Sequence, residues 1–554
     1  MSITLGIFIF IMATGCYAED NTITVDTTLG AIKGIEMETR FGNKFWSFRG
    51  IRYAEPPLGE LRFKNPQPIK AWQPTILDAT NDGPMCPQVT EHMDMLSEDC
   101  LHLNVYTKNV NSDQPLNPVI VFIHPGGFHR GTGISVLMGP QYFMERDIVL
   151  VTFNYRLGSL GFLATDTEEA SGNMGLKDQV LVLRWIREHI EKFGGDPNSV
   201  TLWGYSAGSF SVGLHILSPM SKGLFHRAIM QSASPLGHFT YENNQMELAE
   251  KQAKLLECPV APVSDMIKCL KEKPMLNFVN TAAGMFESNW NPIYNWFPVV
   301  ESDFGQERFL TEDPYKTMMS GNFNKVPLII GLAEYEMYFF AYHTLLSDEQ
   351  RQHFISEFDK YAPIYFLYER GGPKSSNISQ QLESYYFGTS KQIEFPKSVG
   401  KFAEVYSDSL ICYANYRFLQ MIAEHVPVYN YLFKYKGRYN YFKLDDALGA
   451  NHLDELLYLF YSPLLTPIFT KNDPENEIIE RLTRMWYEFA KNSDPNNQSD
   501  EYLKDLQWPL YRPNNKEYLE MGNNEVIVKT NDIFSERMTF WDTIFPLQEV
   551  VGKF

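Results

Sequence analysis

The segment GYSAG, residues 204–208, holds one hydroxyl between two glycines, a pattern in which serine can act as a nucleophile. Glycine fills 36 of the 554 positions, so the pattern alone also fits a small residue in a tight turn. The apolar run after Ser206 predicts a helix, and a buried strand before it is predicted by Val200, Leu202 and Trp203. A strand–turn–helix corner needs glycines at its flanks and lifts the serine clear of the sheet. The context therefore favours a nucleophile.

A serine hydroxyl attacks a carbonyl only when a base takes its proton and donors stabilise the oxyanion. Upstream, residues 119–123 predict a strand that leads into HPGGFHRG, residues 124–131. Paired glycines after a strand let backbone N–H groups approach a ligand, although such a loop can also be an ordinary turn. Its position one strand pair before the serine favours an oxyanion loop. The expected donors are the N–H groups of Gly126, Gly127 and Ala207.

The base must be chosen among twelve histidines. His452 follows a Gly-Ala-Asn turn and precedes a helix-like run, so its imidazole can project from a loop. Most of the others fall inside predicted helices or strands, as His189 and His215 do. His124 and His129 flank the glycine loop and are the serious alternatives.

The acid that orients the base is expected in a loop that follows a strand. Residues 326–330 predict a buried strand, and the loop after it carries Glu334 and Glu336. Either carboxylate fits the chemistry, and either also fits a solvated loop residue. The chain order serine, acid, histidine is the order found in α/β-hydrolases.

Composition excludes some partners. The net charge of −19 argues against nucleic acid or an anionic membrane surface. Hydrophobic residues make up 44% of the chain, enough for a large continuous core, and no Gly/Ser linker, low-complexity tract or internal repeat divides it. The sequence leaves the oligomeric state open.

The N-terminus predicts a secretory signal peptide over residues 1–18. Its apolar stretch, 3–13, is too short to span a bilayer, and cleavage after Ala18 fits the small-residue rule. No later segment resembles a membrane span, and the C-terminal VVGKF is neither an anchor signal nor an ER-retention tetrapeptide. We therefore expect a secreted protein, in which two tripeptides become candidate glycan sites, at Asn377 and Asn497.

Of the six cysteines, Cys16 falls in the signal peptide and five remain. One pair is 14 residues apart and another 11 apart, namely Cys86 with Cys100 and Cys258 with Cys269. In an oxidising compartment each pair could close a short loop, worth about 3 kcal/mol in the chain-entropy model. Cys412 is left over and is expected to be a buried free thiol.

Together these segments resemble the type-B carboxylesterase and cholinesterase family, and most of all its insect carboxylesterases. The resemblance runs from LGAIKGI near residue 29 to YLEMG near residue 522, and it includes FRGIRYAEPPLGELRF, SEDCLHLNVY, NMGLKDQVLVLRWI, FGGDPNSVTLWGYSAGS and GLFHRAIMQSASP. It implies an α/β-hydrolase fold over residues 19–554 as a single domain. In that fold a central, mostly parallel twisted sheet is flanked by helices, with helical insertions over the active-site cleft.

The resemblance implies Ser206 as nucleophile, Glu336 as acid and His452 as base. In the family the acid stands five residues beyond the glycine that ends its strand, here Gly331, which selects Glu336 over Glu334. The implied oxyanion donors are again Gly126, Gly127 and Ala207. No metal or organic cofactor is needed.

The resemblance further implies the disulfides Cys86–Cys100 and Cys258–Cys269 and a buried ion pair between Arg62 and Glu98. It also implies that Ser232 lies close to the triad.

Three departures from the cholinesterase pattern bear on the expected substrate. No tryptophan stands between Cys86 and Cys100, where cholinesterases place one against a quaternary ammonium. Tyr205 precedes the nucleophile, where cholinesterases have glutamate and juvenile hormone esterases typically glutamine. Cys412 also lacks the later cysteine that would complete a third cholinesterase bridge. We therefore do not expect acetylcholine as the natural substrate, and Tyr205 also weakens an assignment as a juvenile hormone esterase.

The sequence predicts a serine esterase that cleaves neutral, mostly apolar small-molecule esters through an acyl-enzyme. One alternative is an abundant, slow esterase that sequesters apolar esters or toxicants. Another is a non-catalytic adhesion or binding protein, a class that usually shows a broken triad and a membrane anchor, neither of which is found here.

Overall fold

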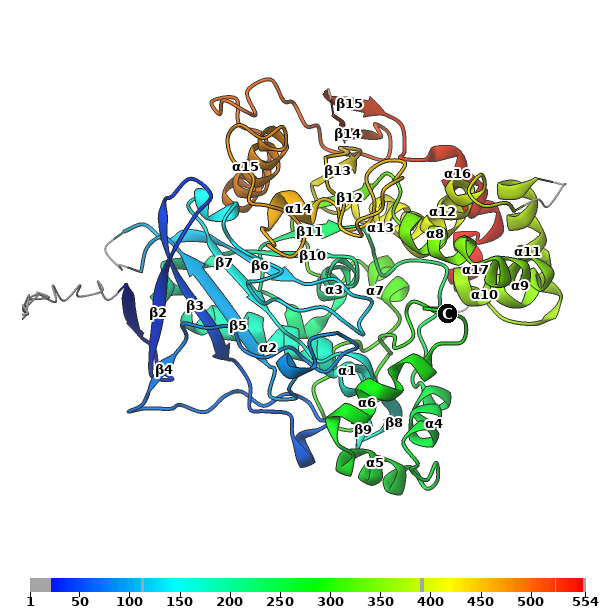
Figure 1. The fold of residues 1–554 in the computed structure, drawn as a ribbon, viewed down its shortest axis with the longest axis horizontal. Helices are drawn as coiled ribbons and strands as arrows, with labels where there is room; N and C mark the ends of the chain where they lie inside the picture. Colours follow the sequence, from blue (N-terminus) through cyan, green and yellow to red (C-terminus); the bar gives the residue numbers. More distant parts are fainter. Residues whose placement is uncertain (1–20, 111–113, 389–392, 524, 552–554) are drawn as a thin grey trace, which may run out of the picture.

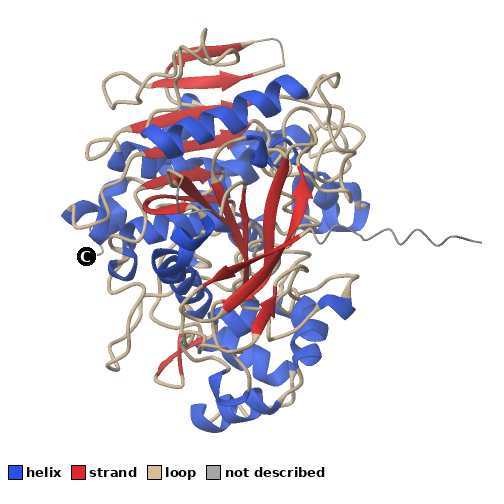
Figure 2. Ribbon diagram, turned by 90° about the vertical axis from the view of Figure 1, so that its left-hand side faces the viewer, coloured by secondary structure: helices blue, strands red, loops and turns tan. Residues whose placement is uncertain are grey.

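The computed structural model describes residues 21–110, 114–388, 393–523 and 525–551. The predicted signal peptide, residues 1–18, lies outside the described residues. A large twisted sheet runs through the middle of the molecule, with helices on both of its sides (Figure 2).

The described strands form a 13-stranded sheet, in which the segment from β7 to β14 is parallel and both edges are antiparallel. The short β4 (Ile76–Asp78) pairs with β2, and a separate hairpin joins β8 (Ala164–Thr167) to β9 (Ala170–Ser171). The order along the main path is β1 (Thr22–Asp26), β2 (Ala31–Glu38), β3 (Lys44–Arg52), β5 (His102–Thr107), β7 (Val149–Phe153), β6 (Asn117–Ile123), β10 (Gly195–Tyr205), β11 (Arg227–Gln231), β12 (Leu328–Ala333), β13 (Val428–Phe433), β14 (Glu517–Met521) and β15 (Val526–Thr530).

Side chains of the central strands alternate between two cores, one on each face of the sheet. In β6, Val119 and Val121 enter the larger core, whereas Ile120 and Phe122 enter the smaller one. Because successive side chains point to opposite faces and both faces are covered, the central strands are apolar throughout.

The helices of the described chain cover both faces and fill the insertions between strands. They are α1 (Gly158–Phe162), α2 (Met174–His189), α3 (Ala207–Leu217), α4 (Met246–Leu255), α5 (Val263–Glu272), α6 (Met275–Thr281), α7 (Pro314–Ser320), α8 (Tyr338–Leu346), α9 (Asp348–Ser356), α10 (Phe358–Phe366), α11 (Gly372–Phe387), α12 (Val399–Ser407), α13 (Tyr413–Ile422), α14 (Leu456–Leu459), α15 (Asn476–Asn492), α16 (Ser535–Ile544) and α17 (Leu547–Val551). Helix α3 packs on β10 and β11 in the larger core, and α15 closes the smaller one.

Two helical insertions gather beyond the central sheet. Helices α4 to α7 lie between β11 and β12 in the chain, and α8 to α13 lie between β12 and β13. Figure 1 shows α4–α6 grouped at one end of the molecule and α8–α12 grouped with α16 and α17 at another. The predicted α/β-hydrolase architecture with helical insertions is therefore correct.

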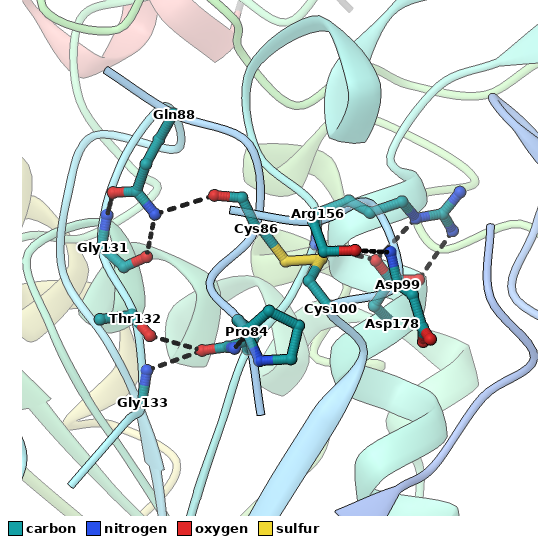
Figure 3. The surroundings of a disulfide bond; sticks show 12 residues. Pro84, Cys86, Gln88, Asp99, Cys100, Gly131, Thr132, Gly133, Arg156 and Asp178 are labelled. Atoms are coloured by element: carbon teal, nitrogen blue, oxygen red, sulfur yellow. Dashed lines mark hydrogen bonds and ion pairs between the residues drawn. A yellow bond between two sulfur atoms is a disulfide. The ribbon is translucent and has the colours of Figure 1, made fainter. Parts of the chain in front are cut away.

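Both disulfides that the resemblance implied are present, Cys86–Cys100 and Cys258–Cys269. The first joins the segment around Gln88 to the start of β5 (Figure 3). Cys412 is a buried free thiol, as expected. The implied ion pair is also present and buried: the Arg62 Nε–H donates to Glu98 at 2.8 Å.

The two candidate glycan sites differ in exposure. Asn377 is exposed on α11, whereas the Asn497 side-chain amide donates to Glu488 at 2.7 Å.

Among the helices of the described residues, none combines the length and apolar character that crossing a bilayer requires.

Candidate active site

Ser206 stands alone at the corner between β10 and α3, with φ 56° and ψ −122°. A Cβ added to Gly204 would lie 2.2 Å from the Gly208 carbonyl oxygen, and one added to Gly208 would lie 2.0 Å from that of Ile123. Neither glycine therefore tolerates a side chain. The Ser206 N–H donates to the Gln231 carbonyl at 2.8 Å, which ties this unfavourable conformation to the neighbouring strand. The predicted strand–turn–helix corner is confirmed.

Three backbone N–H groups beside this corner are free to bind an anion. Gly126 and Gly127 follow β6 with φ values of 128° and 59°, in the region that favours glycine. Ala207 is the first residue of α3, where helix N–H groups lack intrahelical acceptors. None of the three N–H groups donates to another residue within the described part of the chain. The loop and the helix end can therefore supply the donors expected of an oxyanion site.

His452 and Glu336 form a close pair. The His452 Nδ1 lies 2.6 Å from the Glu336 Oε2, and both side chains are buried. The second Glu336 oxygen accepts the Ala333 N–H at 2.7 Å, which anchors the carboxylate at the end of β12. His452 also lines the cavity that contains Ser206. The imidazole thus has a carboxylate on one nitrogen and the serine's cavity in front of it.

Glu334, the alternative acid, pairs with a lysine and not with His452. Glu334 faces Lys434, with 3.5 Å between the carboxylate oxygen and Nζ, and burial raises the pKa of its carboxyl. It makes no contact with the His452 imidazole among the described residues.

The alternative bases, His124 and His129, lie in surroundings that differ from that of His452. The His124 Nδ1 lies 2.8 Å from the Pro125 carbonyl, its ring stacks on Tyr155, and burial lowers its pKa to about 4. Burial, with a smaller effect from Arg130, lowers the pKa of His129 to about 3. No carboxylate contacts either imidazole in the described residues.

The cavity in front of Ser206 has a volume of about 240 Å³ and mostly apolar walls. Its lining comes from the glycine loop after β6, from α8, from the π-helical turn η7 (Asp408–Cys412) and from the loops at 85–92 and 441–453. Apolar lining residues include Met138, Ile293, Met337, Phe340, Leu410 and Phe442. A larger cavity of about 670 Å³ lies beyond Tyr294, which borders both, but it contains none of the three predicted triad residues.

Behind the histidine, a buried polar network includes Tyr205. The Tyr205 hydroxyl accepts hydrogen bonds from the Leu453 N–H at 3.0 Å and from the Ser232 hydroxyl at 3.1 Å. Ser232 thus contacts Tyr205, the residue before Ser206, and its place beside the triad stays a prediction. Tyr205 holds the residue next to His452, so the position that departs from the cholinesterase pattern supports the loop that carries His452.

Sequence reasoning missed Glu455, which is fully buried three residues after His452. It accepts hydrogen bonds from the Tyr431 hydroxyl at 2.7 Å and from the Gln231 amide at 3.0 Å, and burial raises its pKa to about 8. At neutral pH this carboxyl is therefore mostly protonated, so the network holds little net charge. Its place in an apolar run, so close to the predicted base, was the available signal.

Within the described residues, no group of three or more His, Cys, Asp and Glu side chains is arranged to hold a metal ion.

Nearly the whole chain is similar to known esterases. The model of the carboxylesterase family matches residues 21–541. The chain is 37% identical over 496 residues to a juvenile hormone esterase of Tribolium castaneum, covering 85% of this chain and 84% of that protein. It is 32% identical over 538 residues to a carboxylic ester hydrolase of Bombus ignitus, covering 94% of each.

Among solved structures, the chain matches the juvenile hormone esterase from Manduca sexta with OTFP covalently attached. The TM-score is 0.83 at 28% sequence identity, covering 95% of this chain and 99% of that one. A family match over nearly the whole chain, together with relatives above 30% identity, leaves one conclusion: the chain is a carboxylesterase and belongs to the carboxylesterase family.

Proposed function

We propose that this carboxylesterase hydrolyses neutral, mostly apolar esters through a covalent acyl-enzyme on Ser206. The observation that carries the proposal is the buried His452–Glu336 hydrogen bond beside an apolar cavity that Ser206 also lines. The same cavity is lined by Gly126 and Gly127. These observations support a site whose proposed nucleophile, base, acid and oxyanion donors come from four separate segments of the chain.

In this mechanism His452 takes the proton of Ser206 as the hydroxyl attacks the ester carbonyl. Glu336 holds the imidazole in the required tautomer and stabilises the imidazolium. The N–H groups of Gly126, Gly127 and Ala207 bind the oxyanion, and losing one such donor typically costs about 3–4 kcal/mol in the barrier. His452 then protonates the departing alcohol, and a water activated by the same imidazole releases the acid.

The substrate class follows from the cavity. Its apolar walls favour hydrocarbon on both sides of the ester, since burying such surface contributes about 25 cal/mol per Å². Two of the similar proteins are named juvenile hormone esterases. Tyr205 stands where that class typically has glutamine, so we do not extend the hormone to this chain.

Turnover on p-nitrophenyl and naphthyl esters of increasing acyl length tests the proposal. We expect a burst of nitrophenol equal to the enzyme concentration, followed by steady turnover. A burst without turnover would identify a sequestering esterase instead. No burst with any ester would contradict the acyl-enzyme and favour a binding protein.

We further propose that the protein is one secreted domain. Support comes from the signal-like segment 1–18 and from two disulfides, which persist in oxidising compartments. Of the two candidate glycan sites we favour Asn377, because it is exposed and the Asn497 amide is engaged with Glu488.

A choline ester should be a poorer substrate than its neutral counterpart. The first disulfide loop has no tryptophan, and the ring of Trp290 is already covered by the Arg130 guanidinium, 5.3 Å from the ring centre. Because a cation–π contact contributes about 0.5–2 kcal/mol, its absence should lower kcat/KM about tenfold. The measurement compares butyrylthiocholine with a neutral butyrate thioester of similar size. Equal turnover would show that other aromatic residues of the cavity wall, such as Tyr294 or Phe340, form a cation site.

A further inference from the structure

Arg130 lies shortly after Gly126 and Gly127 in the chain, and hydrogen bonds fix its backbone. Its N–H donates to the Gly126 carbonyl at 3.0 Å. The next residue, Gly131, is held from both sides by the Gln88 side chain, which accepts the Gly131 N–H at 2.8 Å and donates to its carbonyl at 2.9 Å (Figure 3). Gln88 in turn donates to the Cys86 carbonyl, so the disulfide loop anchors this position. The start of the Arg130 side chain is thus rigidly placed.

The side chain enters the wall between two hollows. It lines the cavity of Ser206 and also a smaller neighbouring hollow of about 60 Å³ that includes Trp290 and Trp296. Its guanidinium lies over the Trp290 ring, and burial lowers its pKa from the usual value. An arginine still keeps its charge at neutral pH, because its ordinary pKa lies above 12. The Arg130 side chain therefore forms part of the wall between the two cavities, with its guanidinium over Trp290 on the side of the smaller one.

Among the described residues no carboxylate forms an ion pair with the Arg130 guanidinium, and the titratable oxygen that acts on it is the neutral Tyr441 hydroxyl of the Ser206 cavity. No Asp or Glu of the described chain lines either hollow. Other inward-facing arginines are paired: Arg62 with Glu98, and Arg156 with Asp178. A partly dehydrated guanidinium normally gains such a partner, because its fork of donors matches a planar oxygen acceptor.

We propose that Arg130 is a specificity-determining residue that binds an oxygen acceptor on the substrate, foremost a carboxylate carried on the apolar chain away from the ester carbonyl. The proposal rests on the esterase function above and extends its substrates from neutral esters to anionic ones that carry one oxygen acceptor on an apolar chain. Half-esters of dicarboxylic acids are the simplest members of this class. The same charge disfavours cationic esters.

The test uses three p-nitrophenyl esters of similar length: the pentanoate, the 4-oxopentanoate and the glutarate half-ester. In Arg130→Met we expect kcat/KM for the half-ester to fall at least tenfold, mainly through KM, since a hydrogen bond to a charged group typically gives this much. The pentanoate should change less than threefold. Arg130→Lys should keep part of the preference, because it keeps charge without the fork. Lys325→Met, which removes an exposed cation elsewhere, is the matched control.

A loss confined to the oxo-ester would support Arg130 but identify the acceptor as a neutral carbonyl. An equal loss for all three esters would overturn the proposal, since Arg130 would then only shape the oxyanion loop. The proposal is also overturned if Arg130→Met changes the ratio of kcat/KM between the half-ester and the pentanoate by less than threefold. Failure of the native enzyme on the pentanoate would contradict the esterase function itself. If Arg130→Met does not fold, the native enzyme decides: its KM for the glutarate half-ester should be at least tenfold lower than its KM for the pentanoate, and equal KM values overturn the proposal.

Discussion

Ser206→Ala should abolish ester hydrolysis and leave the fold intact. The hydroxyl forms and breaks the covalent bond to the acyl group, so its loss should approach the roughly 10⁶-fold known for triad nucleophiles of serine proteases. Alanine removes one oxygen at a corner whose conformation is held by the Ser206 N–H and by its two flanking glycines, so the backbone has no reason to move. The measurement is kcat on a p-nitrophenyl ester, together with burst amplitude and thermal stability.

Ser209→Ala is the matched control. Ser209 lies in the first turn of α3, the helix that directly follows Ser206, and its buried hydroxyl donates to the Ala233 carbonyl at 2.5 Å, away from the cavity. That variant should lose about 1 kcal/mol of stability, the usual value of one hydrogen bond, and keep most of its activity. A purified Ser206→Ala enzyme that retained more than a few per cent of native kcat would remove Ser206 from its proposed role.

The elbow and the glycine loop could be predicted because their causes are local. A buried strand, a glycine-flanked serine and an apolar helix follow one another within residues 200–217, and no distant residue is needed to recognise them. The position of Gly126 and Gly127 likewise depends on the strand that ends at Ile123. Such patterns can be recognised in the sequence because neighbouring residues alone determine which side chains of a strand are apolar and where the turn after it lies.

Contacts between distant segments could not be predicted from the residues alone. Local chemistry left Glu334 and Glu336 equivalent, and only the resemblance chose between them. The structure separates them because the end of β12 supplies the Ala333 N–H to one, while β13 brings Lys434 to the other. The contact between Tyr205 and Leu453 spans 248 positions. Within the placed part of the chain, no Asp or Glu lines the cavities beside Arg130, and this too depends on how distant segments pack.

The two glutamates give the sharpest test of this part of the site. Glu336→Gln should lower kcat on the order of 10⁴-fold, the effect seen when the orienting carboxylate of a serine protease becomes an amide. The amide cannot stabilise the imidazolium as a carboxylate does, and it can present an N–H donor to the His452 Nδ1, which favours the wrong tautomer.

Glu334→Gln makes the same change two residues away and should alter kcat less than threefold. Its carboxylate is partly exposed and pairs at 3.5 Å with Lys434, a contact worth about 0–1 kcal/mol of stability. Both variants keep side-chain size, so their comparison isolates the charge. Measuring kcat and KM for both on one neutral ester decides the assignment. If Glu334→Gln proved the damaging change and Glu336→Gln the silent one, the acid would stand two residues earlier in the loop. The hydrogen bond between His452 and Glu336 would then have no part in catalysis.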